Sequence, residues 1–229
     1  MEGSAAQSLY RDFVTRLDRH DREGCISLAL SSLSQGEIDI VCLYDRILAP
    51  ALRETICRTE GRELCVWEEH VRTSIVRTVL ECCHPAVVEE GRRRCGLGGR
   101  GEAMVVCPRE EFHEIGARMV ADFFTLCGFT ATFVGANTPQ EDILKAIRHI
   151  KPAYVAISVS SSYNLVAARR TAEQVLGVRK AMAQPFTLIV GGTAFERNPG
   201  VAEEMGADLL LHTFEDIRQL VEKEHGCSP

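Results

Sequence analysis

Five short apolar runs alternate with amphipathic stretches in the second half of the chain, and this alternation limits the possible folds more than any other feature. The runs lie at 103–107, 129–134, 153–159, 186–190 and 208–211. Helix starts are marked by Asn137-Thr138-Pro139 and by Asn198-Pro199, with proline expected at the first helical position. Strands and helices that alternate in this way predict an α/β fold with a five-stranded parallel sheet and right-handed crossovers.

The first part of the chain, to about residue 90, has the apolar spacing of helices only. Four helices joined by short links are expected, and they favour an antiparallel four-helix bundle. Asp21 begins the second helix and Asp39 caps the third, in which Pro50 predicts a bend. The fourth helix is expected from about Glu63 to His84-Pro85.

The boundary between the two parts is expected at residues 91–101, which are rich in glycine and contain Arg92-Arg93-Arg94. This composition is typical of a flexible, solvated linker and favours that reading over a nucleic-acid contact. The predicted domains are therefore a helical bundle at 1–90, the linker at 91–101 and a sheet domain at 102–229. The sheet domain is expected to be flavodoxin- or Rossmann-like, with strand order 2-1-3-4-5.

Composition excludes several classes of protein. The net charge of −6 argues against direct binding of nucleic acid, which requires a basic face. No apolar run has the length needed to cross a bilayer, and the amino terminus lacks a signal-peptide core, so a cytoplasmic protein without a membrane partner is expected. The 10 cysteines form no Cys-x-x-Cys pair, and most lie inside apolar patterns as small hydrophobic residues.

Polar and glycine-rich segments follow three of the predicted strands, at the edge of the sheet where open α/β folds bind ligands. They are Glu111 to Gly116, Ser158-Val159-Ser160 and Gly191-Gly192. Each has an ordinary structural reading when taken alone. A histidine such as His113 is usually a polar loop residue, a serine run caps a helix, and a glycine pair makes a turn.

Taken together, the three segments resemble the fingerprint of the cobalamin-binding domain, which is Asp-x-His-x-x-Gly, then Ser-x-Leu, then Gly-Gly. Methionine synthase, the corrinoid proteins of methyltransferase systems and cobalamin-dependent light sensors share this pattern. The chain departs from it at Glu111, where the family has Asp, and at Ser160, where it has Leu. Corrinoid proteins and cobalamin photoreceptors also place a four-helix bundle before the sheet domain, so the resemblance covers nearly the whole chain.

The resemblance implies cobalamin as the cofactor, bound with its own base displaced and with His113 as the lower axial ligand of cobalt. Glu111 is expected to accept a hydrogen bond from His113 and to hold its tautomer. Gly116 is expected to give the corrin or its nucleotide tail room that a Cβ would fill. The remaining residues implied to bind the cofactor are Glu114, Ile115, Ser158, Ser160, Ser161, Gly191, Gly192, Thr193 and Phe195.

The helical part carries Glu68-Glu69-His70, which resembles the Glu-Glu-His of the cap bundle over the upper face of the corrin. Glu69 and His70 are thus candidates for the reactive face, with an exposed helix turn as the alternative. Photoreceptors have a tryptophan ten residues before that glutamate, where this chain has Thr59. Trp67 is predicted either to cover the corrin or to pack in the bundle core.

Two functions are carried forward. The first is a corrinoid protein that carries a methyl group on cobalt between partner methyltransferases, with a reductive activation protein as a further partner. Such a chain is a subunit of a methyltransferase system rather than a complete enzyme. The alternative is a light or redox sensor of the antirepressor type, favoured by Glu111 and Phe195 and disfavoured by Thr59 and the lack of a DNA-binding domain. A flavodoxin-like domain that binds another nucleotide is the third possibility.

Overall fold

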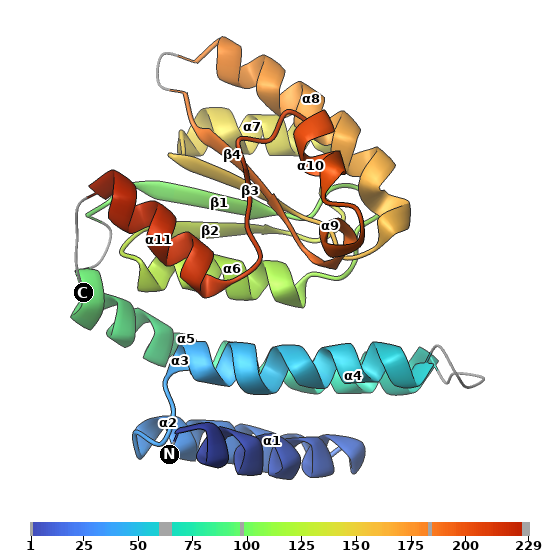
Figure 1. The fold of residues 1–229 in the computed structure, drawn as a ribbon, viewed down its shortest axis with the longest axis vertical. Coiled ribbons are helices and arrows are strands. Elements are labelled where there is room, and N and C mark those ends of the chain that lie inside the picture. Colours follow the sequence, from blue (N-terminus) through green and yellow to red (C-terminus); the bar gives the residue numbers. More distant parts are fainter. Residues whose placement is uncertain (1, 60–65, 97–98, 183–184, 226–229) are drawn as a thin grey trace. The chain divides into compact units, whose positions relative to one another are not determined.

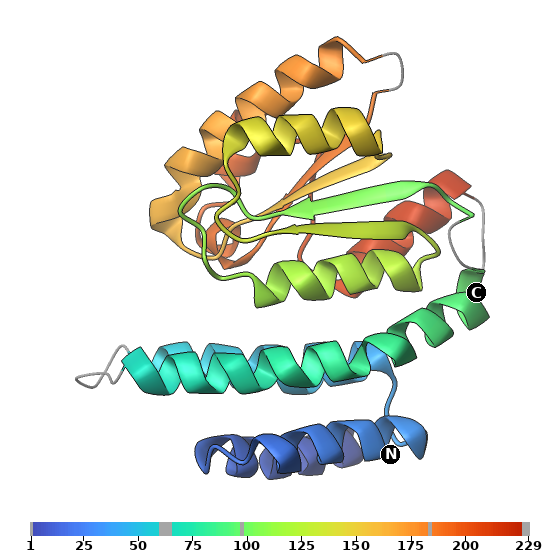
Figure 2. The same cartoon turned by 180° about the vertical axis from the view of Figure 1, so that it is seen from behind.

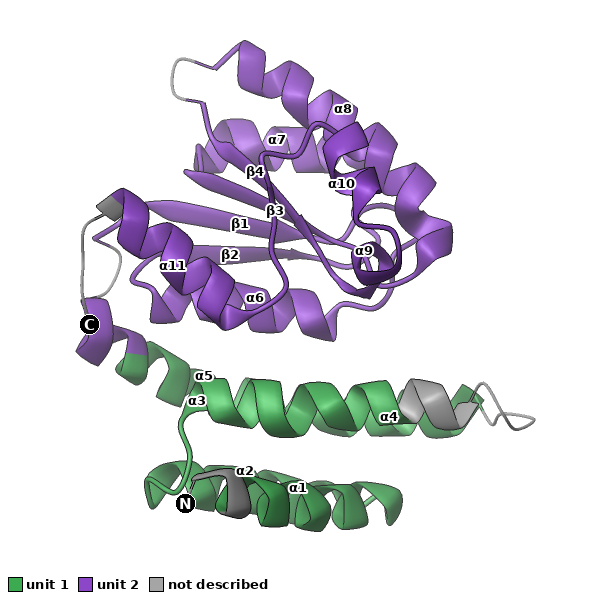
Figure 3. Cartoon of the chain, in the orientation of Figure 1, with its two compact units in different colours: residues 1–90 green, residues 91–229 purple. Residues whose placement is uncertain are grey.

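The computed structural model describes residues 2–59, 66–96, 99–182 and 185–225, and Figure 1 shows their course. The chain forms two compact units, Met1–Glu90 and Gly91–Pro229 (Figure 3). The first is helical and the second contains the sheet. Each unit is described by itself.

The helical unit contains the predicted four helical segments, and two of them begin at aspartates as expected. Asp21 accepts a hydrogen bond from the backbone N–H of Gly24 at 2.9 Å, and Asp39 accepts one from Cys42 at 2.7 Å. These caps satisfy N–H groups that have no partner inside the helix. The elements of this unit are α1 (Glu2–Asp18), α2 (Arg22–Ser34), α3 (Ile40–Cys42), the π-helical η1 (Leu43–Leu48), α4 (Ala49–Thr59) and α5 (Val66–Cys95), whose last five residues, from Gly91, belong to the second unit.

The irregularity expected at Pro50 takes the form of a π-helical turn. Elements α3, η1 and α4 follow one another without a break, and η1 ends two residues before Pro50. Proline has no N–H and its ring clashes with the carbonyl of the residue four positions earlier. A wider turn just before it accommodates both effects while the buried residues of η1 keep their packing.

The predicted end of the fourth helix at His84-Pro85 is wrong, because α5 continues through Pro85 to Cys95. Buried side chains on both sides of the proline, such as Leu80 and Val87, hold the helix together. Residues 91–95 of the predicted linker are therefore helical. Gly91 is a packing position, since a Cβ there would lie 2.6 Å from the carbonyl oxygen of Thr125.

The sheet unit has the predicted strand order, β2-β1-β3-β4-β5, and every neighbouring pair is parallel. Helices α7 and α10 begin one residue later than expected, so that Pro139 and Pro199 occupy the N-cap. The strands are β1 (Glu102–Val106), β2 (Thr130–Gly135), β3 (Tyr154–Ser158), β4 (Thr187–Gly191) and β5 (Leu209–Leu210). The helical elements are α6 (Ile115–Leu126), α7 (Gln140–Ile150), the 3₁₀-helix η2 (Ser162–Asn164), α8 (Leu165–Lys180), α9 (Thr193–Arg197), α10 (Gly200–Glu204) and α11 (Phe214–His225).

Helices cover both faces of the sheet. In Figure 1 and Figure 2, α6 and α11 lie on one side, and α7 and α8 lie on the other. The inner residues of β1, β3 and β4 are almost fully buried, which explains why these strands are continuous apolar runs in the sequence. Because all strands are parallel, the loops after β1, β3 and β4 meet at the carboxyl edge.

No helix in the described part of the chain has the length and apolar character needed to cross a membrane.

Candidate functional site

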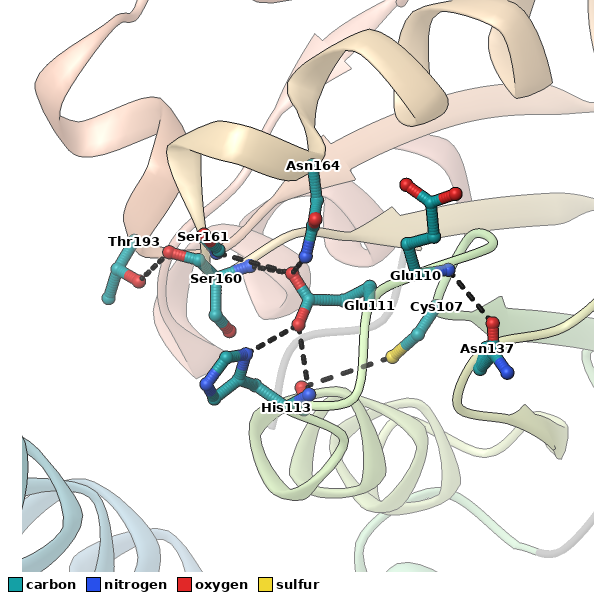
Figure 4. Close-up of polar contacts among 9 residues, drawn as sticks. All are labelled: Cys107, Glu110, Glu111, His113, Asn137, Ser160, Ser161, Asn164 and Thr193. Carbon is teal, nitrogen blue, oxygen red and sulfur yellow. Dashed lines mark hydrogen bonds and ion pairs between the residues drawn. The ribbon is translucent and has the colours of Figure 1, made fainter. Parts of the chain in front are cut away.

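The centre of the site is the carboxylate of Glu111, which is completely buried in the loop after β1. Five N–H groups donate to it. The ring Nδ1 and backbone N–H of His113 lie 2.6 and 2.9 Å from Oε1. The backbone N–H groups of Ser160 and Ser161 and the side-chain amide of Asn164 lie 2.9, 3.2 and 3.1 Å from Oε2. Figure 4 shows the carboxylate between the two sets of donors.

These donors keep Glu111 ionised although it is buried. Burial alone raises the pKa of a carboxylic acid, because it disfavours the charged form. Hydrogen bonds from the side chain and backbone of His113, and then from Asn164 and Ser160, outweigh this effect and lower the pKa of Glu111 to about 2. The site therefore contains a fixed negative charge at neutral pH.

The Glu111 anion orients the imidazole of His113. A carboxylate at 2.6 Å accepts the proton of Nδ1, which leaves the lone pair of the neutral ring on Nε2. The side chain of His113 is 51% exposed, and in Figure 4 its other ring nitrogen points away from Glu111. A neutral imidazole whose second nitrogen donates to a carboxylate is the arrangement that proteins use for metal-binding histidines. The predicted contact between Glu111 and His113 is thus present.

The loop after β2 supports the backbone beside Glu111. Asn137 donates its backbone N–H to the carbonyl of Glu111 at 2.8 Å, and its side-chain oxygen accepts from the N–H of Glu110 at 2.9 Å. Glu110 and Asn137 both have positive φ, at 71° and 48°. These reciprocal bonds stabilise a backbone turn that non-glycine residues rarely adopt.

Cys107, at the end of β1, does not compete as a metal ligand. Its thiol lies 4.0 Å from the carbonyl oxygen of His113 and is buried. Burial, followed by the charges of Glu111 and Glu114, raises the pKa of the Cys107 thiol to about 12. Because the thiolate is the form that binds metals, Cys107 remains an inert packing residue.

The loops after β3 and β4 are joined to each other and to Glu111. Ser158 is half-buried at the end of β3, where it pairs with Gly191. Ser160 and Ser161 contribute backbone N–H groups, and the hydroxyl of Thr193 donates to the carbonyl of Ser160 at 2.9 Å. No serine side chain caps η2, so the helix-capping interpretation of the serine run is wrong.

The glycines at the edge have different reasons for being glycine. Gly192 has a φ of 106°, and a Cβ there would lie 2.3 Å from the carbonyl oxygen of Val159. A Cβ at Gly191 would lie 2.4 Å from the carbonyl oxygen of Leu211. The close approach of the loops after β3, β4 and β5 therefore requires both. At Gly116 a Cβ would meet no atom of the protein within 4 Å.

Three other residues that were predicted to bind the cofactor differ in how deeply they are buried. Phe195 is fully buried in the core between the sheet and α8. Ile115 is 6% exposed at the start of α6, while Glu114 is half-buried at its N-cap.

The candidates in the helical unit lie in the first turns of α5. Trp67 is 55% exposed, which excludes the bundle-core interpretation, and its ring packs edge-on against His20 at 5.6 Å. Glu69 is half-buried and His70 is exposed. The side chain of Thr59 lies outside the described residues.

Asn164 and Asn137 belong to the site but were not predicted from the sequence. Each stands in the loop after a strand, on the same edge as His113, and this position is the signal that marks them. Nothing in the local sequence pattern distinguishes them from ordinary loop asparagines.

The sequence and the fold have known relatives. The family model described as "B12 binding domain" matches residues 101–222. The chain is 28% identical over 173 residues to the HTH-type transcriptional repressor CarH of Myxococcus xanthus, covering 75% of this chain and 52% of the repressor. It is 27% identical over 176 residues to the repressor CarA of the same organism, covering 76% and 55%. The chain spans about half the length of these relatives.

The fold is similar to two corrinoid structures from Methanosarcina barkeri. The monomethylamine corrinoid protein matches with a TM-score of 0.79 and 14% identity, over 95% of this chain and 99% of that protein. A chain of the methanol:cobalamin methyltransferase complex MtaBC matches with a TM-score of 0.50 and 14% identity, over 98% and 84%.

Proposed function

The chain belongs to the B12-binding domain family and binds cobalamin, and on this premise we propose that it is a corrinoid methyl carrier. In this proposal His113 is the lower axial ligand of cobalt, and the chain presents the cofactor to partner methyltransferases. When bound, cobalamin supplies a cobalt centre that accepts a methyl group and gives it up again. The chain itself supplies the ligand, its orientation and the surrounding surface.

The observation that carries the proposal is the hydrogen bond by which Glu111 orients the imidazole of His113. The buried anion accepts the proton of Nδ1 at 2.6 Å, and the half-exposed ring keeps the lone pair of Nε2. A histidine that donates to a carboxylate is also a stronger base toward a metal. A neutral imidazole with a free lone pair is a donor that cobalt would accept, so the residues present fit cobalamin.

The open surface beside Gly116 also supports the proposal. A Cβ there would meet no protein atom within 4 Å, so packing within the chain does not require glycine at this position. A large ligand held by His113 does require it when the ligand occupies the space next to α6. Ser158, Gly191, Gly192 and Thr193 are the proposed residues around its tail.

The carrier role is supported by the two corrinoid structures of similar fold. Their likeness extends over both units of the chain, and one of them is part of a methyltransferase complex. The proposed upper-face residues are Glu69, His70 and Trp67 at the start of α5. Glu69 and His70 are proposed to meet a small polar or methyl ligand.

Affinity and mass together test the carrier role. The protein is expected to retain about one hydroxocobalamin per chain through gel filtration, and to bind methylcobalamin at least as tightly as adenosylcobalamin. Green light is expected to leave the molecular mass of any complex unchanged, as measured by light scattering. Strong preference for adenosylcobalamin, with a change of mass in the light, would contradict the proposal.

A light-responsive regulator is the second candidate. The specific observation in its favour is the similarity to the repressors CarH and CarA over three quarters of this chain. The same experiment separates the two functions, because a regulator is expected to change its assembly when the upper ligand is lost.

A further inference from the structure

Three large apolar side chains of the sheet unit are exposed, and they belong to two neighbouring segments at the carboxyl edge of the sheet. Phe112 is 66% exposed, Tyr163 is 94% exposed and Val166 is 63% exposed. The other strongly exposed apolar residues among those described, Leu30, Val66 and Trp67, belong to the helical unit. Single exposed apolar residues are ordinary, but a group of them at one edge marks a binding surface.

The three residues lie beside the hydrogen bonds that surround the carboxylate of Glu111. Phe112 stands between Glu111 and His113 in the loop after β1. Tyr163 precedes Asn164, whose amide donates to Glu111 at 3.1 Å, and Val166 follows in the first turn of α8. The hydrogen bonds of Glu111 thus hold the loop that carries Phe112 next to residues 160–164, which lead into the first turn of α8, at the carboxyl edge of the sheet.

We propose that Phe112, Tyr163 and Val166 form an apolar platform that contacts the corrin macrocycle of cobalamin beside His113. A flat macrocycle held through Nε2 of His113 has to lie across the residues around that ring. Much of its rim is hydrocarbon, so contact with two aromatic rings and a valine removes apolar surface from water on both partners. The platform rests on the proposed ligation, because His113 sets where the macrocycle lies.

Because the platform lies next to His113, the corrin is favoured over a protein partner as the molecule that covers it. The platform directly flanks the one side chain to which the macrocycle is bound in the proposed function. An aromatic side chain that becomes buried on binding contributes roughly tenfold or more to affinity, and tenfold corresponds to about 1.4 kcal/mol. Neither Phe112 nor Tyr163 packs in the core, so the folded chain tolerates their replacement.

The test uses two corrinoids, hydroxocobalamin and cobinamide, which is the corrin without its nucleotide tail. Dissociation constants are measured by absorbance titration for wild type, Phe112→Ala and Tyr163→Ser. Each variant is expected to bind both corrinoids about tenfold more weakly. Tyr163→Phe retains the ring and is expected to bind like wild type, and so is Leu30→Ala, which removes an exposed apolar residue of the helical unit.

Several outcomes would overturn the platform. One is that Phe112→Ala and Tyr163→Ser bind both corrinoids within about twofold of wild type, given unchanged thermal unfolding. Another is that the variants change the molecular mass measured by light scattering but leave the affinity for both corrinoids unchanged. The platform would then be an interface with another copy of the protein. Failure of the proposed ligation can be told apart from failure of the platform. Loss of ligation by His113 appears in the visible spectrum of the wild-type hydroxocobalamin complex, whereas the cobinamide affinities of the variants report on the platform. A wild-type chain that binds neither corrinoid would overturn both.

Discussion

Replacing Glu111 with Gln tests how strongly the buried anion organises the site. The substitution keeps the shape of the side chain and removes its charge. One of its two terminal atoms then becomes a donor that faces either the two N–H groups of His113 or those of Ser160, Ser161 and Asn164. Two or more buried donors lose their acceptor, and such a loss is among the larger single-residue effects on stability.

The pKa of Glu111 sets the magnitude. It falls from an ordinary 4.5 to about 2, and each pKa unit corresponds to about 1.4 kcal/mol in favour of the anion. The network thus favours the ionised side chain by about 3 kcal/mol, and Glu111→Gln is expected to lower the free energy of unfolding by a similar amount. Urea unfolding of the cofactor-free protein at pH 7, followed by circular dichroism, measures it.

Glu110→Gln is the matched control. Glu110 is the preceding residue, it is exposed, and it contributes its backbone N–H to the loop rather than its carboxylate. Its replacement is expected to change stability by less than about 0.5 kcal/mol. The reasoning is refuted if Glu111→Gln is as stable as Glu110→Gln.

Three further predictions concern pH and two of the glycines. Because the folded pKa of Glu111 is depressed, its contribution of about 3 kcal/mol is present above pH 4.5 and is lost as the pH falls toward about 2. Urea unfolding across this range should show a loss that is larger in wild type than in Glu111→Gln by about that amount, since other carboxylates with a lowered pKa, such as Glu215, titrate in both proteins. Equal pH dependence of the two proteins would contradict this prediction. Gly192→Ala is expected to lower the unfolding free energy by about 3 kcal/mol or more, because its Cβ meets the Val159 carbonyl at positive φ. Gly116→Ala, in contrast, should leave the cofactor-free protein as stable as wild type and weaken cobalamin binding, and unchanged affinity would show that this space is not used.

The five strands were predictable because each leaves an apolar run of its own in the sequence, and their order followed from the flavodoxin-like topology. The end of α5 was not, since Pro85 and Gly91 are local stop signals that tertiary packing overrides. Buried residues such as Val87 hold the helix beyond Pro85, and Gly91 fits against the carbonyl of Thr125. Proline and glycine thus mark a helix end only where no packing opposes it.

The site was predictable where side chains of recognisable type form a spaced motif, as with Glu111 and His113. The rest of the carboxylate's environment was not, because the backbone N–H groups of Ser160 and Ser161 have no signature in the sequence. Asn164 also required the fold, since its contact with Glu111 joins residues far apart in the chain. The glycine pair was predicted as a lining for the cofactor tail. The structure shows that glycine is also required there because three loops approach each other closely.

The central claim is that His113 is the lower ligand of cobalt, and electron paramagnetic resonance of the cobalt(II) state tests it most directly. Protein labelled with nitrogen-15 is loaded with unlabelled cobalamin and reduced by one electron. If Nε2 of His113 binds cobalt, its nuclear spin of one half splits each cobalt line into a doublet, and His113→Ala abolishes that splitting. A triplet in the labelled wild-type complex would show that the cofactor's own nitrogen-14 base holds the cobalt, and would contradict the account.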